Sequence, residues 1–173
     1  ATGGVGSMAV SILSHIGFEV TALNGVKDER EFLTGMGARS VLEIDELVDD
    51  GKRPLLRERW SACVDTVGGG VLTSAIRSTR AYGAVSCCGN VVSGDISLTV
   101  YPFILRGISL YGIDSQNCPM PLRVRAWEML AGGWKFPWLE KIATEVPLDG
   151  AERGIESILA GTHRGRTVVN LWN

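Results

Sequence analysis

The sequence lacks the features that mark several classes of protein. No apolar run approaches the roughly 20 residues that a membrane-spanning helix needs, and no secretory signal peptide is visible. The 17 basic and 19 acidic residues give a net charge of −2, so nothing suggests binding to nucleic acid or to an anionic membrane. The 173 residues, 45% of them hydrophobic, are typical of a soluble globular chain with one domain or slightly more.

Metal ligands are scarce as well. The only imidazoles are His15 and His163, and the four cysteines include no C-x-x-C pair. Cys87 and Cys88 are adjacent in a strand-like run, which would point their side chains to opposite faces. We interpret the cysteines as buried or partly buried free thiols of a reducing compartment rather than disulfides or metal ligands. The sequence therefore predicts a cytoplasmic protein without a metal site.

Glycine is abundant, and its arrangement at the start of the chain is the strongest signal. Residues 1–6 read Ala-Thr-Gly-Gly-Val-Gly, the back half of a dinucleotide-binding turn. Such a turn lets backbone N–H groups approach a pyrophosphate at a helix N-terminus. Met8, Ile12 and Leu13 share one face of the helix that would follow. A β-like run over 18–23 ends at Asn24, about where the ribose-reading residue belongs, roughly 20 positions past the turn.

Strand-like and helix-like stretches alternate through the rest of the chain, which predicts an α/β protein with a parallel sheet. Asp28 and Glu31 resemble a capping box, which would start a helix that ends at Gly35 or Gly37. Segment 45–59 is expected to be a surface helix and loop. Further helices are predicted at about 70–78, 103–106, 121–131 and 149–160. Strands are predicted at 40–43, 62–67, 84–88, 109–113 and 167–171.

Several stretches together resemble one family. These are the opening turn over 1–7, Asp-Thr-Val-Gly at 65–68, Pro-Phe-Ile-Leu-Arg-Gly at 102–107, Tyr-Gly-Ile-Asp-Ser at 111–115 and Gly-Arg-Thr-Val-Val at 165–169. With them the chain resembles the cofactor-binding part of a medium-chain dehydrogenase/reductase. It is similar to the zinc-independent, quinone-oxidoreductase-like branch and, within it, to the acrylyl-CoA reductase group.

The resemblance implies a Rossmann fold, a doubly wound parallel sheet whose first strand would lie before Ala1. Residues 1–135 would form the NADP(H)-binding domain, and 136–173 a segment returning to a catalytic domain. We therefore expect the sequence to be part of a chain about twice as long. Related enzymes often dimerise through the sheet edge of this domain, so a homo-oligomer is expected.

Candidate site residues follow from the turn and from the resemblance. Gly3, Gly4, Val5 and Gly6 would line the pyrophosphate. Asn24 would set cofactor selectivity, because a neutral residue there does not repel a 2′-phosphate. Lys27 and Arg30 would add positive charge, and these features together predict NADP(H). The alternative is that Lys27 and Arg30 are solvated charges at a helix start.

The nicotinamide end would lie farther along the chain. Thr66, Val67 and Gly89 would border its ribose, or else merely pack at strand ends. The backbone of the stretch holding Phe103 and Ile104 would face the nicotinamide amide, while these two side chains pack as apolar residues. Arg106 could bind the cofactor or serve as a structural cation. Arg166 could reach a cofactor phosphate or form a surface ion pair. Asp114 and Ser115 could help to form the cofactor mouth, but we expect them to cap the next element.

The implied reaction is hydride transfer from NADPH to an activated C=C bond, such as that of acrylyl-CoA, or to a quinone. No catalytic residue is assigned here, because such groups would come from the other domain. A short-chain dehydrogenase is rejected, because none of Tyr82, Tyr101 and Tyr111 is followed four positions later by lysine. An enoyl-reductase module of a polyketide or fatty-acid synthase, and a nucleotide-binding module without activity of its own, remain as alternatives.

Overall fold

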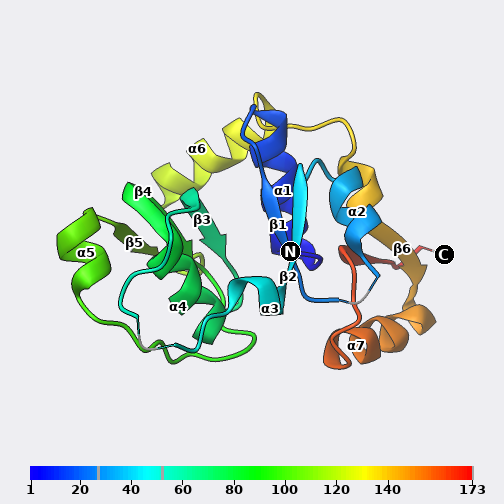
Figure 1. Ribbon diagram of the computed structural model, residues 1–173. Helices are drawn as coiled ribbons and strands as arrows, with labels where there is room; N and C mark the ends of the chain where they lie inside the picture. Colours follow the sequence, from blue (N-terminus) through cyan, green and yellow to red (C-terminus); the bar gives the residue numbers. More distant parts are fainter. Residues whose placement is uncertain (27, 52, 173) are drawn as a thin grey trace. The chain divides into compact units, whose positions relative to one another are not determined.

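The computed structural model describes residues 1–26, 28–51 and 53–172, and they form two compact units (Figure 1). Unit 1 contains Ala1–Leu42 and Met120–Asn173, and unit 2 contains Glu43–Pro119. Segment 136–173 therefore belongs to the same compact unit as the glycine turn. These compact units do not correspond to the two predicted domains, 1–135 and 136–173. The domain boundary at residue 135 stays a prediction.

Unit 1 combines elements from both ends of the sequence. A 12-residue helix, α1, follows the glycine turn, and strands β1 and β2 are hydrogen-bonded neighbours. Strands β6 and β7 form a separate parallel pair, in which Ala143 is aligned with Arg166. The elements are α1 Gly4–His15, β1 Thr21–Asn24, α2 Arg30–Gly35, β2 Ser40–Glu43, α6 Met120–Ala131, the 3-10 turns η1 Leu139–Ile142 and η2 Leu148–Gly150, β6 Ala143–Pro147, α7 Ala151–Leu159 and β7 Arg166–Asn170.

The core of unit 1 joins these two parts of the sequence. Phe136 and Ile142 pack with a cluster of buried residues from α1 to β2, namely Val10, Ala22, Leu33, Met36, Ala38 and Val41. Trp138 packs against this cluster and donates a hydrogen bond from Nε1 to Ser11 Oγ, at 3.1 Å. The C-terminal segment is thus held in place beside the dinucleotide-turn helix.

Unit 2 is a three-stranded parallel sheet in the order β3-β4-β5, with helices connecting its strands. Its small core is built from Leu72, Ile76, Val85 and Ile108. Because all three strands are parallel, their carboxyl ends meet at one edge of the sheet. The elements are α3 Ile44–Leu47, β3 Trp60–Asp65, α4 Gly69–Ser78, β4 Thr79–Cys87, α5 Tyr101–Arg106 and β5 Ser109–Gly112.

Two arginines, buried Arg77 and partly buried Arg106, hold the loop after α3 against the rest of unit 2. Arg77 donates to the carbonyl oxygens of Asp49 and Gly51, at 2.8 and 3.0 Å, and pairs with the Asp49 carboxylate at 3.2 Å. Arg106 donates to the carbonyl oxygens of Leu56 and Thr79, at 2.6 and 3.1 Å. Each guanidinium thus supplies hydrogen-bond donors to backbone carbonyl groups that the loop and β4 leave available.

The local predictions differ from the structure in several details. Met8 and Ile12 of the predicted apolar face pack against the unit 1 core, but the buried residues of α1 are Ser7, Val10 and Ser11. Small serines allow the helix to approach its neighbours closely, which the apolar periodicity did not reveal. Helix α2 has no side-chain cap, because Asp28 adopts a left-handed conformation with φ of 64°.

The capping box occurs instead between Glu43 and Glu46, at the start of α3. Helix α6 is present at the predicted place, but it buries none of its residues. Strand β6 was not predicted, because Ala143–Pro147 has no strong apolar alternation; it forms as the partner of β7. In the described ranges, none of the helices combines the length and apolar content that crossing a membrane requires.

Candidate functional site

The glycine turn in unit 1 leads directly into the N-terminus of α1. Gly3 is the N-cap residue, with extended backbone angles (φ −71°, ψ 172°) and no side-chain cap. A Cβ atom added at Gly3 would meet no atom within 4 Å, so the space above the turn is open. The amides of the first helical turn have no partner inside the helix. This end of α1 therefore offers backbone N–H groups and a partial positive charge to an anion.

The C-terminal segment is hydrogen-bonded to this turn. Gly165 N–H donates to the Thr2 carbonyl oxygen at 2.9 Å, and Gly3 and Gly165 form a parallel bridge. Gly165 has φ of 66°, and a Cβ atom there would overlap the carbonyl oxygen of Ile142. Only glycine fits this position, so residues 164–166 can run closely alongside the turn.

Arg166 lies against the first residue of α1. A Cβ atom added at Gly4 would be 2.6 Å from Arg166 Nε and 2.7 Å from Arg166 Cζ. The guanidinium of Arg166 thus adds a full positive charge beside the helix N-terminus. The ion pair of this segment is made by the neighbouring Arg164, with Glu29 at 3.4 Å. The turn, the helix end and Arg166 together fit a phosphate group.

The predicted selectivity residue ends β1. Asn24 is 2% exposed, and its Oδ1 accepts a hydrogen bond from Val26 N–H at 3.3 Å, so the side chain braces the loop that follows. Arg30 donates from Nη1 to the Val41 carbonyl oxygen at 3.0 Å, which directs its guanidinium towards β2. Lys27 lies outside the described residues.

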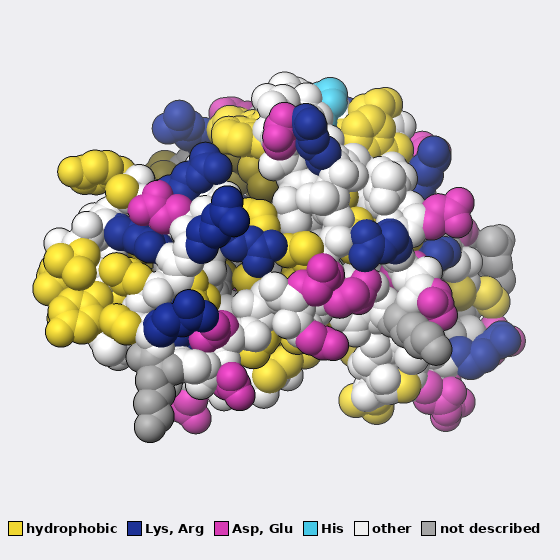
Figure 2. Space-filling model, in the orientation of Figure 1, with side chains coloured by type: hydrophobic (Ala, Val, Ile, Leu, Met, Phe, Trp, Pro, Cys, Tyr) yellow, Lys and Arg dark blue, Asp and Glu magenta, His cyan; other side chains and the backbone are white. Residues whose placement is uncertain are grey.

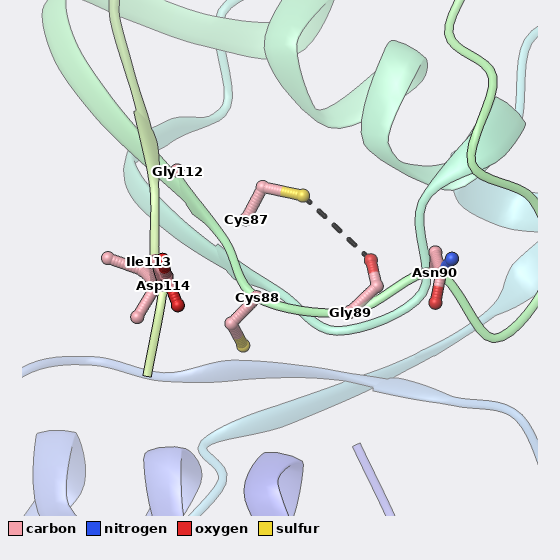
Figure 3. A pocket seen from close by; sticks show the side chains of 7 residues that line it. All are labelled: Cys87, Cys88, Gly89, Asn90, Gly112, Ile113 and Asp114. Atoms are coloured by element: carbon pink, nitrogen blue, oxygen red, sulfur yellow. Dashed lines mark hydrogen bonds between the residues drawn. The ribbon is translucent and has the colours of Figure 1, made fainter. Parts of the chain in front are cut away.

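In unit 2, an open depression lies at the carboxyl ends of β4 and β5 (Figure 3). Its lining residues come from the two strand ends and the turns after them: Cys87, Cys88, Gly89, Asn90, Gly112, Ile113 and Asp114. In open α/β sheets ligands bind at the carboxyl ends of the strands. Of this lining, Gly89 was predicted as a site residue, and Asp114 was considered for the cofactor mouth. The other lining residues were missed, although they lie at or just after the ends of two predicted strands.

Thr66 and Val67 lie beside this depression, after β3. A Cβ atom at Gly89 would overlap the Thr66 carbonyl oxygen, so the turn after β4 touches the backbone of Thr66. Val67 accepts a hydrogen bond from Val92 N–H at 3.0 Å. The predicted residues Thr66, Val67 and Gly89 are therefore brought together at the carboxyl ends of the strands of unit 2.

The charged and sulfur groups near the depression are held by local hydrogen bonds. The Asp114 carboxylate accepts from Asn117 N–H at 3.0 Å and from Asn117 Nδ2 at 2.8 Å, and these bonds lower the pKa of Asp114. Asp114 therefore caps the turn after β5, as predicted. Burial, together with the nearby Asp65 carboxylate, raises the pKa of Cys88, whose Sγ donates to the Asp65 carbonyl oxygen at 3.3 Å.

All four cysteines are free thiols, as predicted, and Cys63, Cys87 and Cys118 are partly buried. Cys88 is exposed, so its predicted burial is wrong; it lies just past the end of β4. In Figure 3 the Sγ atoms of Cys87 and Cys88 point in different directions. Among the residues that the structure describes, no group of three or more His, Cys, Asp or Glu side chains is placed to hold a metal ion.

The stretch from Phe103 to Arg106 lies away from the depression. The Arg106 guanidinium contacts the Arg77 and Thr79 carbonyl oxygens at the start of β4, and its Nε pairs with Glu58 at 3.4 Å. The depression lies at the other end of that strand. The contacts of Arg106 are those of the structural cation, and they give no support to cofactor binding.

The backbone of this stretch is also engaged. The amides of Phe103 and Ile104 donate to the Val100 carbonyl oxygen, and the Phe103 carbonyl accepts from Gly107 N–H. Phe103 packs against the core of unit 2, as predicted, but Ile104 is 67% exposed, so its predicted packing is wrong. These bonds use the two amides and the Phe103 carbonyl, and a contact of this backbone stretch with a nicotinamide amide stays a prediction.

The α/β fold with parallel strands and a glycine turn at a helix N-terminus defines a dinucleotide-binding dehydrogenase fold. The model of the family described as zinc-binding dehydrogenase matches residues 4–131, and the chain belongs to this family. This agrees with the resemblance to medium-chain dehydrogenases found in the sequence.

Individual relatives are consistent with this assignment. The chain is 38% identical over 99% of its length to acrylyl-CoA reductase AcuI of Ruegeria pomeroyi, and equally to YhfP of Bacillus subtilis, a protein provisionally named a quinone oxidoreductase. The chain spans about half the length of these curated relatives, 52% of each.

Two solved structures have the same fold. The yhdH oxidoreductase of Salmonella enterica, in complex with NADP, has a TM-score of 0.93 and 34% identity over 98% of this chain and 52% of its own. The yhfP protein of Bacillus subtilis, with NAD bound, has a TM-score of 0.92 and 37% identity over 97% of this chain and 51% of its own.

Proposed function

We propose that this chain binds NADP(H) and forms the cofactor-binding part of an oxidoreductase. The observation that carries the proposal is the open glycine turn at the N-terminus of α1 with Arg166 lying against Gly4. Gly3, Gly4, Val5 and Gly6 bind the pyrophosphate through their backbone, and Arg166 pairs with a cofactor phosphate. The relatives crystallised with NADP and with NAD support a dinucleotide at this turn.

The preference for NADP(H) rests on charge. In the sequence, position 24 carries a neutral residue and Lys27 with Arg30 adds positive charge after it, and a phosphorylated ribose needs surroundings without a carboxylate at position 24. A carboxylate at position 24 would instead favour NAD. Since the related structures contain both dinucleotides, this preference needs its own measurement.

We assign the nicotinamide end to unit 2. Thr66, Val67 and Gly89 border its ribose, and the turns after β4 and β5 add Asn90 and Ile113. When bound, the cofactor supplies a hydride, which adds to the β-carbon of an activated alkene while a proton reaches the α-carbon. The contribution of these residues is to hold the ring in position and to exclude water from it. No catalytic acid is assigned in this chain.

The substrate is proposed to be a small molecule with an activated C=C bond, such as acrylyl-CoA, or a quinone. The names of AcuI and YhfP support these two classes. Reduction proceeds without zinc in this proposal, in keeping with the resemblance to the quinone-oxidoreductase-like branch. The groups that polarise the substrate are assigned to the half of the relatives' length that this chain does not span, so the isolated chain would bind cofactor without turnover.

The four free cysteines support a reducing, cytoplasmic compartment.

A homo-oligomer is proposed through the edge of unit 2. Strand β5 is the terminal strand of its sheet, and apolar side chains gather over α5, at the left edge of Figure 2. The exposed apolar residues of α5 and β5 are Tyr101, Ile104, Leu105, Leu110 and Tyr111. An edge strand with apolar neighbours is suited to association with a second copy.

The binding proposal is tested by titrating the protein and its Arg166→Gln variant with NADPH, following tryptophan fluorescence. Arg153→Gln, which removes an exposed arginine of α7, is the matched control. Loss of a charge-assisted phosphate contact should weaken NADPH binding about tenfold in Arg166→Gln and leave the control unchanged. Equal affinity in all three proteins would remove Arg166 from the site.

The reaction is tested by following NADPH oxidation with acrylyl-CoA and, separately, with a quinone. Oxidation by this chain alone would contradict the assignment of the remaining groups to the other half of the relatives. Saturable NADPH binding without oxidation agrees with it, and the same assay on a chain of the relatives' full length then decides between the two substrate classes.

A further inference from the structure

A second arginine of the C-terminal segment contacts the loop that follows β1. Arg164 Nη1 lies 3.4 Å from Glu29 Oε2, and the Arg164 Cζ atom lies 5.1 Å from the centre of the Phe32 ring. Glu29 is the N-cap residue of α2 and ends the loop that Asn24 begins. Arg164 is therefore paired with a carboxylate on the loop where a Rossmann fold reads the adenosine ribose.

The position of Arg164 is fixed by its neighbours in the sequence. Gly165 is bonded to Thr2, and Arg166 lies against Gly4, so the segment 164–166 runs beside the glycine turn. One short segment thus brings one cation to the phosphate-binding turn and another to Glu29. The contact with the Phe32 ring also holds the Arg164 guanidinium over α2 through a cation–π interaction.

We propose that Arg164 determines cofactor specificity by neutralising Glu29, so that the loop after β1 accepts the 2′-phosphate of NADP(H). The inference rests on the proposed cofactor function. An unpaired Glu29 carboxylate would repel a group that carries close to two negative charges, and NAD(H) lacks this group. Arg164 acts through Glu29, so it is a positioning residue and not itself a ligand.

The pair is suited to mutation, because it contributes little to folding. The Arg164 side chain is 57% exposed and the Glu29 side chain 21%, and ion pairs that solvent reaches contribute little to stability. A comparable pair in the same unit joins Arg39 to Glu19. These two residues precede β2 and β1, where Thr21 is hydrogen-bonded to Ser40, so the pair lies at the starts of the strands, away from Asn24. Arg39→Gln is therefore the matched control.

The test is a double-mutant cycle with Arg164→Gln, Glu29→Gln and the double variant, measuring Kd for NADPH and NADH by tryptophan fluorescence. Arg164→Gln should weaken NADPH binding about fivefold and NADH binding less than about twofold, an effect that falls as salt is raised. The double variant should regain most of the NADPH affinity, because the repelling carboxylate is then absent. Arg39→Gln should change neither Kd.

Two results would overturn the inference while leaving the proposed function intact. Arg164→Gln could weaken both dinucleotides equally, which indicates a structural role, or the double variant could bind NADPH as poorly as Arg164→Gln. If the unaltered protein binds neither dinucleotide, the proposed function fails and the inference fails with it.

Discussion

At the scale of single residues, two glycines beside the depression of unit 2 differ sharply in their surroundings. A Cβ atom at Gly89 would overlap the Thr66 carbonyl oxygen, whereas one at Gly112 would meet nothing within 4 Å. We expect Gly89→Ala to lower the free energy of unfolding by about 1–3 kcal/mol, because the turn has to move. Gly112→Ala should change it by less than about 0.5 kcal/mol. Urea denaturation measures both, and equal effects would contradict the close approach of Gly89 to Thr66.

The buried thiol of Cys63 predicts a pH dependence of stability. Burial raises the pKa of Cys63 from 9.0 to about 11. The folded state therefore holds this proton more tightly than the unfolded state, and its contribution is fully present below pH 9. It is lost as pH rises from 9 to about 11, on the order of 2 kcal/mol. Cys63→Ala should lack this part of the slope in denaturation curves, and identical slopes in the two proteins would contradict the burial effect.

At the scale of elements, Arg106 connects α5 to the loop before β3. Its guanidinium has three carbonyl acceptors and Glu58, and the side chain is 13% exposed. Arg106→Ala should cost about 1–3 kcal/mol, because it removes hydrogen bonds to part-buried carbonyl groups. Arg53→Ala, which removes a 77% exposed partner of Asp49, should cost less than about 1 kcal/mol.

Thermal or urea denaturation of the two arginine variants gives the comparison. A folded Arg106→Lys variant that keeps the NADPH affinity of the protein would agree with the structural role. A large loss of affinity with unchanged stability would instead restore the predicted cofactor contact.

Most elements were predictable because their signals are local. The glycine turn before α1, the run of small and apolar residues that became β3, and the helix over 101–106 each carry their own pattern of apolar residues, glycine or proline. The burial that this run suggested for β3 is not observed, because only Asp65 of the strand is buried. Boundaries were less accurate, because pairing extends strands beyond their apolar residues. Strand β4 begins at Thr79, directly after α4, since Thr79 is aligned with Trp60 of β3.

The part of the candidate site that consists of backbone groups could be predicted, because the glycine turn is visible in the local sequence. Gly4 and Arg166 lie together, although their positions differ by 162 in the sequence, and the binding of a cofactor phosphate by Arg166 stays a prediction. The contacts of Arg164 with Glu29 and of Arg106 with three carbonyl groups depend on how distant segments pack. No local pattern distinguishes an arginine that binds a phosphate from one that satisfies buried carbonyl groups.

At the scale of the whole molecule, the exposed apolar side chains of α5 and β5 predict self-association through unit 2. Leu105 is 64% exposed, and Leu105→Glu places a charge in the proposed contact. We expect light scattering after gel filtration to give a dimer for the protein and a monomer for this variant. Leu148→Glu, at a 65% exposed position of unit 1, should leave the dimer intact. A monomeric protein, or a dimer in both variants, would exclude this contact.

The central claim is that the glycine turn at the start of α1 binds the phosphates of NADP(H), and calorimetric titration of Gly3→Ala tests it most directly. A Cβ atom at Gly3 meets nothing in the protein and would fill the space over the turn; Gly35→Ala, equally free of contacts, is the control. We predict saturable binding to the protein and to the control, tighter for NADPH than for NADH. Gly3→Ala should bind NADPH at least about tenfold more weakly, a difference of about 1.4 kcal/mol. Absence of binding, or equal binding by Gly3→Ala, would contradict the account.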